Sequence, residues 1–375
     1  MPRSLAYEPR NALNAICPYF TMFPLEYPLR VLKSHYKKGP VVMDPFCGRG
    51  TTLFAARQMG LVSRGIDSSP VAVAIARAKL CKVDVDSTLD LAQKFIDDNR
   101  VSDVPDTEFF QCAFSPLVLE QICAVRAALL KTNRDNDSIA LLRAAMLGCL
   151  HGPRSKSIER QAYLSNQMPR TFGSKPDYSV KYWKAHDMTP PQVDIVSVLR
   201  RKLSLLQRSE LHNDVSIADV RLGDSRYAKS LPMEKRNFSL VITSPPYYGM
   251  RTYVEDQWLR NWFLGGPSHV QYGEKAQLQH TGQDVFTKSL GTVWKNMART
   301  RAEDLHMYIR FGSIPSKKNV NTKKMLRDSL DASGVSWRVI STRPAETAAS
   351  GKRQAGHMSI NSVAATEFDF HVCRY

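Results

Sequence analysis

GPVVMDPFCGRGTT, residues 39–52, has the form of a strand, a glycine turn and a helix. The apolar run VVM is interpreted as a buried strand, the turn lies at GRG, and TTLFAARQM continues as a helix that is apolar on most sides. LVSRGID (61–67) follows as a second strand that ends in an acid. Ser68-Ser69-Pro70 then begins a second helix, since hydroxyl caps followed by proline are typical of helix starts. This β-α-β-α order predicts an α/β fold with a parallel sheet and helices on its faces.

The second half of the chain returns to strands after a helical stretch. Strand patterns occur at 214–224, 238–242 and 305–311, and two late strands at 335–340 and 367–373 suit antiparallel pairing. The stretch between the two groups of strands, 86–210, is mainly helical and basic, and its clearest helices are expected at 115–130 and 138–150. We therefore expect a mostly parallel, Rossmann-like sheet with an antiparallel late strand, interrupted by a mainly helical insertion. The expected boundaries are 1–85, 86–210 and 211–375, the outer two being halves of one catalytic domain.

Composition favours a polyanionic partner. The 375 residues carry a formal net charge of +17, from 52 Lys and Arg against 35 Asp and Glu, and nucleic acid is the most plausible polyanion. No apolar run is long enough to span a membrane, and the N-terminal sequence lacks an apolar signal core. The seven cysteines are odd in number and form no CxxC pair, so neither a metal site nor a disulfide framework is expected. These features predict a soluble protein of a reducing cytoplasm.

The glycine turn at DPFCGRG is typical of a nucleoside-binding site. Gly48 and Gly50 allow the backbone to turn tightly and to approach a ligand closely. The following helix directs free N–H groups toward that ligand, and an acid about 20 residues further on can bind ribose hydroxyls, here Asp67. The sequence is not GxxxxGK[ST], and the third glycine of a dinucleotide-binding GxGxxG is missing. A nucleoside cofactor without a pyrophosphate fits best.

TSPPY (243–247) follows the buried strand FSLVI (238–242). Two prolines end a strand and hold a short rigid segment, because their φ is nearly fixed and they donate no backbone hydrogen bond. Ser244 and the carbonyls around Pro245 can accept hydrogen bonds from the exocyclic amine of a nucleobase, and Tyr247 can stack on its ring. The structural alternative is a proline turn that only ends the strand.

Together these residues resemble the S-adenosylmethionine-dependent DNA amino-methyltransferases, which methylate cytosine N4 or adenine N6. DPFCGRGTT resembles their cofactor motif, and Ser244-Pro245-Pro246-Tyr247 matches their catalytic form [DNS]PP[YFW], whose serine version is typical of the N4-cytosine branch. YFTMFPLEYP (19–28) and RLGDSRY (221–227) resemble two further cofactor motifs. The resemblance implies catalytic roles for Ser244, Pro245, Pro246 and Tyr247. It implies S-adenosylmethionine contacts for Phe23, Pro24, Asp44, Pro45, Phe46, Gly48, Gly50, Thr51, Asp67, Asp224 and Ser225.

The activity implied is direct methyl transfer to the N4 amine of cytosine in double-stranded DNA, by a prokaryotic or phage-type enzyme, with a cognate restriction endonuclease as a possible partner and with no metal and no membrane involved. The target base must leave the stack to be methylated. No cysteine nucleophile is needed, and the Pro-Cys dipeptide typical of C5-cytosine chemistry does not occur. The alternatives are adenine N6 methylation, RNA amine methylation and an inactive DNA-binding protein. The insertion is the candidate target-recognition region. Candidate DNA contacts are Asn166, Gln167, Arg170, Lys175 and Arg251.

Overall fold

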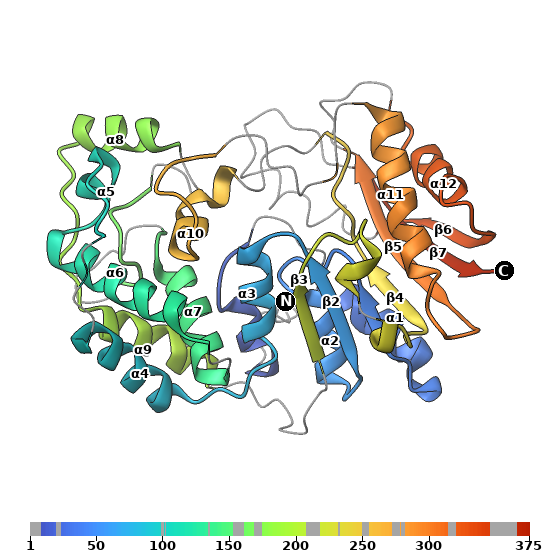
Figure 1. Ribbon diagram of the computed structural model, residues 1–375, viewed down its shortest axis with the longest axis horizontal. Helices are drawn as coiled ribbons and strands as arrows, with labels where there is room; N and C mark the ends of the chain where they lie inside the picture. Colours follow the sequence, from blue (N-terminus) through green and yellow to red (C-terminus); the bar gives the residue numbers. More distant parts are fainter. Residues whose placement is uncertain are drawn as a thin grey trace, which may run out of the picture. The chain divides into compact units, whose positions relative to one another are not determined.

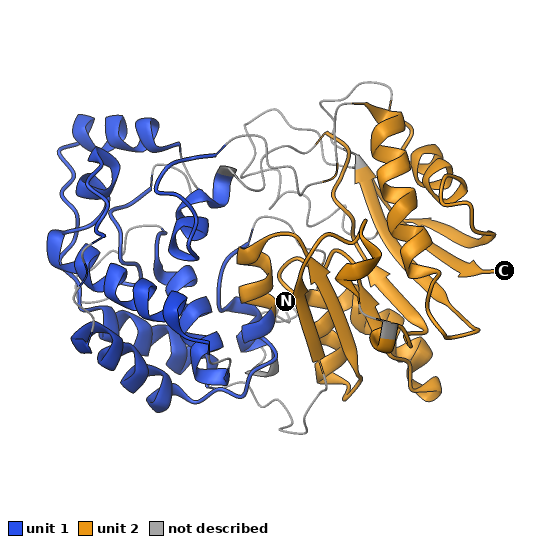
Figure 2. Cartoon of the chain, viewed as in Figure 1, with its two compact units in different colours: residues 1–20, 77–213, 253–273 blue, residues 21–76, 214–252, 274–375 orange. Residues whose placement is uncertain are grey.

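The computed structural model of the chain divides into two compact units (Figure 2). The sheet unit comprises Thr21–Ala76, Asp214–Thr252 and Glu274–Tyr375, and the helical unit comprises Met1–Phe20, Arg77–Asn213 and Tyr253–Gly273. The structure describes residues 9–19, 24–98, 101, 103–133, 136–152, 161–168, 175–207, 218–231, 233–249, 255–271, 278, 282–313, 320–345 and 366–375.

The sheet unit contains one sheet, which has seven strands within the described residues (Figure 1). Their order is β3-β2-β1-β4-β5-β7-β6. Neighbouring strands from β3 to β5 pair in parallel, whereas β7 runs antiparallel to both β5 and β6. This confirms the predicted mostly parallel, Rossmann-like sheet with an antiparallel late strand. The strands are β1 Val42–Asp44, β2 Ser63–Asp67, β3 Ala218–Leu222, β4 Leu240–Thr243, β5 His306–Ser313, β6 Trp337–Pro344 and β7 Thr366–Arg374.

One face of the sheet carries the apolar side chains that alternate along β5 in the sequence. Met307, Ile309 and Phe311 of β5 are fully buried and share a core with α11 and α12, which cover this end of the sheet (Figure 1). Successive side chains of a strand point to opposite faces, so His306, Tyr308 and Arg310 face the other side. The helices of this unit are α1 Glu26–His35, α2 Thr51–Gln58, α3 Pro70–Ala78, α11 Gln283–Met297 and α12 Thr322–Asp331, with 3₁₀ turns at Tyr36–Lys38, Ala228–Ser230 and Met233–Lys235.

A buried ion pair stabilises the opposite face. Arg310, only 2% exposed, makes two hydrogen bonds of 2.6 and 2.8 Å to Asp369 on the paired strand β7. The ring of Tyr27 from α1 lies 4.1 Å from the guanidinium carbon, a cation–π contact, and Arg30 lies 3.6 Å from the same carboxylate. The charges of this face are therefore matched where α1 packs on the sheet.

The helical unit has an aromatic core. Phe109 and Phe110 of α5 contact Trp258 and Trp262 of α10 with ring centroids 4.7 to 6.1 Å apart, and Trp183 of α8 lies 5.4 Å from Phe109. These contacts explain why 253–273 groups with the helical unit, whereas the sequence boundaries assigned it to the second catalytic half. The helices are α4 Val85–Asp98, α5 Glu108–Ala113, α6 Pro116–Lys131, α7 Asp137–Cys149, α8 Pro176–Ala185, α9 Ile195–Leu206 and α10 Trp258–Phe263, with 3₁₀ turns at Pro9–Ala15 and Glu255–Gln257. None of the described helices is long and apolar enough to cross a membrane.

Candidate active site

The two sequence motifs meet where the strand order of the sheet reverses. β1 lies in the middle, β2 and β3 follow on one side, and β4 and β5 on the other. The carboxyl ends of parallel strands share one edge of the sheet, and ligands of open α/β sheets bind in the crevice at such a reversal. The glycine turn leaves β1 at this edge and the Pro-Pro segment leaves β4 beside it.

Direct hydrogen bonds join the two motifs. The hydroxyl of Thr243, the last residue of β4, donates to Asp44 Oδ1 at 2.7 Å, and Asp44 is the last residue of β1. The hydroxyl of Thr52, in the helix that follows the glycine turn, donates to the carbonyl oxygen of Ile242 at 3.2 Å. The segments that carry Gly48 and Ser244 are therefore fixed to each other inside one unit.

Asp44 is a deeply buried carboxylate at this edge. It is 1% exposed, and burial raises its pKa to about 7, against the opposing effect of its hydrogen bonds. Oδ1 accepts from the Thr243 hydroxyl and from the backbone N–H of Phe46 at 3.1 Å. Oδ2 is buried and has no hydrogen-bond partner among the described residues. A buried acceptor of this kind fits a donor or a positive group on a ligand.

The two glycines of the turn serve different purposes. Gly50 has φ +73° and directly precedes α2; a Cβ placed on it would lie 2.8 Å from Ala76 Cβ, so α2 and α3 pack closely here. Gly48 has φ +49°, and a Cβ there would meet nothing within 4 Å. The missing side chain at Gly50 allows helix packing. At Gly48 it leaves the backbone open to an approaching ligand, as the cofactor interpretation requires.

Asp67 ends β2 and contacts the same turn. Its Oδ2 accepts from the Gly48 N–H at 2.8 Å and its Oδ1 from the Ser69 N–H at 2.9 Å. Burial raises the pKa of Asp67, and these N–H donors oppose the shift. Each carboxylate oxygen can accept a second hydrogen bond, so the arrangement accommodates a pair of ribose hydroxyls.

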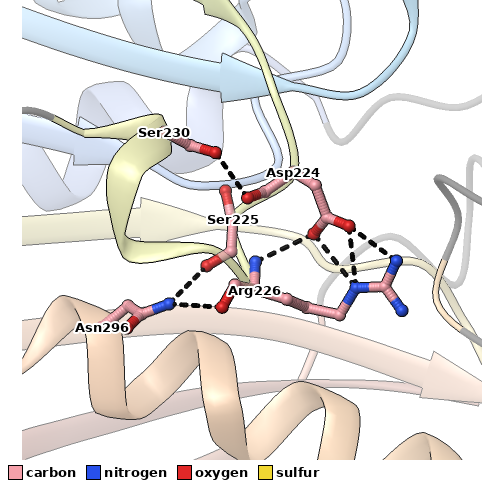
Figure 3. A network of polar contacts seen from close by, with 5 residues as sticks. All are labelled: Asp224, Ser225, Arg226, Ser230 and Asn296. Carbon is pink, nitrogen blue, oxygen red and sulfur yellow. Dashed lines mark hydrogen bonds and ion pairs between the residues drawn. The ribbon is translucent and has the colours of Figure 1, made fainter.

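The segment that follows β3 is hydrogen-bonded to two neighbouring elements, and Figure 3 shows its contacts with Asn296 of α11. The Ser225 hydroxyl donates to the Pro45 carbonyl oxygen at 2.6 Å, which links the β3 and β1 exits. Asn296 of α11 donates from Nδ2 to the carbonyl oxygens of Ser225 and Arg226, both at 2.9 Å. Asp224 is paired with the guanidinium of Arg226 through both oxygens, and this pairing raises the pKa of Arg226. The Ser225 hydrogen bonds therefore hold the loop in place, and the negative charge of Asp224 is paired with Arg226 in the same turn.

The Pro-Pro corner presents one tyrosine and buries the next. Ser244 is half-buried and Pro245 is buried. Tyr247 is half-buried, its ring meets Phe311 edge-on with centroids 6.0 Å apart, and its hydroxyl donates to Glu367 Oε1 at 2.7 Å. Tyr248 is 8% exposed and packs edge-on against Phe286 in the core. Only the first tyrosine is placed to meet a ligand.

The remaining predicted cofactor residues lie at the glycine turn and before α1. Phe46 is half-buried with its ring 6.4 Å from that of Trp294, and Thr51 is buried at the start of α2. Pro24 is half-buried just before α1, whereas Phe23 lies outside the described residues. Among the described residues, no group of three or more His, Cys, Asp or Glu could hold a metal ion.

The predicted DNA contacts separate into different environments. Asn166 is 4% exposed, and its side chain donates to the carbonyl oxygens of Cys112 and Met188 at 3.2 Å each. Its Oδ1 accepts from the N–H of Gln167. The side chain of Asn166 is therefore bonded within the helical unit and is not placed to read a base, and the prediction that it does so is wrong. Gln167 is half-buried, and Lys175 is exposed at the start of α8. Arg170 and Arg251 lie outside the described residues.

Several residues at this edge were not predicted, namely Thr243, Arg226, Asn296, Gly312 and Glu367. Thr243 stands beside the Pro-Pro motif, and its position at a strand end was a usable signal. Arg226 lies within RLGDSRY, directly after the predicted Asp224 and Ser225. Asn296, Gly312 and Glu367 lie far from the motifs in the sequence, and only the folded sheet brings them to the site.

Comparisons with known proteins agree with the predicted resemblance over the first part of the chain. Residues 4–78 match the family model N6_N4_Mtase, described as DNA methylase. The Type II methyltransferase M.MjaII of Methanocaldococcus jannaschii is 41% identical over 73 residues, which are 20% of this chain and 14% of that protein. These two matches confirm the resemblance to DNA amino-methyltransferases and support S-adenosylmethionine as methyl donor, and they do not distinguish N4 from N6 chemistry.

Solved structures with a similar arrangement include two of the rRNA methyltransferase aviRa from Streptomyces viridochromogenes. They are 11% and 10% identical to this chain, each with a TM-score of 0.34. The first match covers 99% of this chain and 95% of that one, and the second covers 98% and 94%.

Proposed function

We propose that the chain is an S-adenosylmethionine-dependent DNA methyltransferase that methylates the exocyclic N4 amine of cytosine. The observation that carries the proposal is the hydrogen bond between Asp44 and Thr243. It holds the glycine turn, which suits a nucleoside cofactor, against the Ser-Pro-Pro-Tyr corner, which suits a nucleobase. Two such sites on adjacent strand ends are what methyl transfer between a nucleoside donor and a base requires.

The cofactor would be held by the residues at the exits of β1, β2 and β3. Gly48 offers an open backbone, Asp67 accommodates ribose hydroxyls, and Asp44 Oδ2 offers a buried acceptor to a positive group. S-adenosylmethionine supplies a methyl group already activated by its sulfonium, so the protein's task is alignment and polarisation. The donor set therefore fits this cofactor.

The amine would be held by Ser244 and by the backbone carbonyls of the Pro-Pro corner. Ser244 Oγ accepts an N–H hydrogen bond from the amine and so orients the nitrogen lone pair toward the donor. When bound, S-adenosylmethionine would supply its activated methyl group to the aligned amine nitrogen, and the amine would lose one proton to water or through Ser244. The first residue of the tetrapeptide, serine, favours cytosine N4 over adenine N6.

The substrate is proposed to be double-stranded DNA, with the helical unit and its basic residues as the target-recognition region. The charge of +17 and the exposed Lys175 support a phosphate contact surface. The relative M.MjaII is a Type II methyltransferase, which supports a role beside a restriction endonuclease for this chain as well.

Mass spectrometry of nucleosides tests the proposal directly. Purified protein, S-adenosylmethionine and unmethylated plasmid DNA are expected to yield N4-methylcytosine. N6-methyladenine would move the proposal to the adenine branch. Methylated nucleosides found only in a parallel reaction with RNA in place of the plasmid would overturn the DNA substrate.

Substitution of Ser244 tests its assigned role. Ser244→Ala should lower turnover about 100-fold, with cofactor affinity by calorimetry nearly unchanged. Ser336→Ala, an exposed serine ahead of β6, is the matched control and should behave as wild type. Equal turnover in the two variants would remove Ser244 from the mechanism.

A further inference from the structure

The pairing of β5 and β7 prepares a place for the ring of Tyr247. Gly312 of β5 lies opposite Glu367 of β7 in the strand register. A Cβ on Gly312 would lie 2.8 Å from Tyr247 Cε2 and 3.1 Å from both Tyr247 Cζ and Glu367 Cγ. The backbone of Gly312 does not have a positive φ, so any residue could adopt its conformation. The glycine is therefore needed for space: a side chain there would displace the ring.

Glu367 fixes that ring at its far end. The Tyr247 hydroxyl donates to Glu367 Oε1 at 2.7 Å, within the range of a strong bond to a charged acceptor. The edge-on contact with Phe311, at 87° between the ring planes, supports the ring from a third direction. The backbone side is already stiff, because Tyr247 directly follows two prolines. Three strands, β4, β5 and β7, thus determine the orientation of a single side chain.

We propose that Glu367 is a positioning residue that holds the Tyr247 ring as the stacking platform for the target base. The inference rests on the proposed function. A tyrosine whose hydroxyl is committed to a carboxylate cannot rotate freely, so less conformational freedom is lost when a base stacks on it. An extruded base that meets an aligned ring stays close to the donor methyl, and a misaligned ring lowers the fraction of productive complexes.

Glu367→Leu removes the acceptor while keeping an apolar side chain of similar size, and Glu367→Gln keeps an oxygen that can accept the hydroxyl. We expect Glu367→Leu to lower kcat about 10-fold without changing the calorimetric Kd for S-adenosylmethionine, and Glu367→Gln to stay within about threefold of wild type. Tyr247→Phe should equal Glu367→Leu, and the double variant should show no further loss, because both remove the same bond. A double variant about 100-fold below wild type would overturn the proposal, as would a Glu367→Leu enzyme with wild-type kcat.

Binding without cofactor supplies a second readout. In a duplex with the fluorescent cytosine analogue pyrrolocytosine at the position found to be methylated, wild-type protein should raise the fluorescence as the base unstacks. Glu367→Leu should change the emission of the bound base, and Glu367→Gln should restore it. Gly312→Ala leaves Tyr247 and Glu367 unsubstituted, but its Cβ would displace the ring, so it should reproduce the loss. This variant covers the case of a poorly folded Leu variant. If the wild type transfers no methyl group, the proposed function fails; if it does and all variants match it in kcat and emission, only the role of Glu367 fails.

Discussion

Replacing Thr243 by valine should destabilise the protein in a pH-dependent way. The two side chains have similar shape and Thr243 is fully buried, so packing is preserved and the main loss is the hydrogen bond to Asp44 Oδ1. Burial raises the pKa of Asp44 to about 7 in the folded protein, from an ordinary value of 3.8. This difference corresponds to about 4 kcal/mol of stability that is present below pH 4 and is lost as the pH rises to about 7.

The size of the Thr243 effect follows from the charge on Asp44. Below pH 7 the carboxyl is largely neutral, and loss of one neutral hydrogen bond should cost about 1 kcal/mol. Above pH 7 Asp44 is ionised, and loss of a donor to a buried charge should cost about 1.5–3 kcal/mol. Because the hydroxyl lowers the pKa of Asp44, the variant should have a still higher pKa and should go on losing stability above pH 7, where the wild type has levelled off.

Urea unfolding at pH 6 and pH 8.5 measures this difference. Thr243→Ser keeps the hydroxyl and should show a small loss that is the same at both pH values. Thr243→Val should lose about 0.5–2 kcal/mol more at pH 8.5 than at pH 6, and the difference should vanish in an Asp44→Asn background. An equal loss at both pH values would refute the assignment of a charged bond at this joint.

Two further perturbations separate packing from ligand contact. Gly50→Ala should lower the free energy of unfolding by roughly 2 kcal/mol or more, because it adds a clash with Ala76 to a strained φ. Gly48→Ala should cost only about 1 kcal/mol but should weaken S-adenosylmethionine binding more strongly. Urea unfolding measures the first effect and calorimetry the second. Asp369→Asn should cost about 3–5 kcal/mol by leaving the buried Arg310 charge without its anion, and a midpoint of urea unfolding equal to wild type would contradict that role.

Local sequence patterns predicted the elements that build the site. The strand of VVM, the turn at GRG and the acid that ends LVSRGID are present as expected, since each depends on neighbouring residues alone. The strands of the second half were likewise predictable, because apolar alternation such as that of Met307, Ile309 and Phe311 reports burial on one face.

The partners across the sheet were not predictable in the same way. Glu367 and Asn296 reach the site only through strand register and helix packing, which a single sequence does not specify. Asn166 shows the reverse case. Its neighbours in the sequence are basic and aromatic, yet its side chain donates hydrogen bonds to backbone carbonyl oxygens of the helical unit. An amide in a polar stretch looks the same in sequence whether it faces a base or the interior.

The order of segments along the chain has a consequence for biosynthesis. Asp44 and Thr243 are separated by 199 residues, and most of the helical unit is encoded between them. At a translation rate of about 5–20 residues per second, β1 waits roughly 10–40 s before β4 leaves the ribosome. During that time one edge of an apolar strand has no partner from its own sheet, which makes the nascent chain a substrate for chaperones and proteases. Slow codons upstream of residue 243 should therefore reduce the yield of soluble protein more than slow codons placed after it.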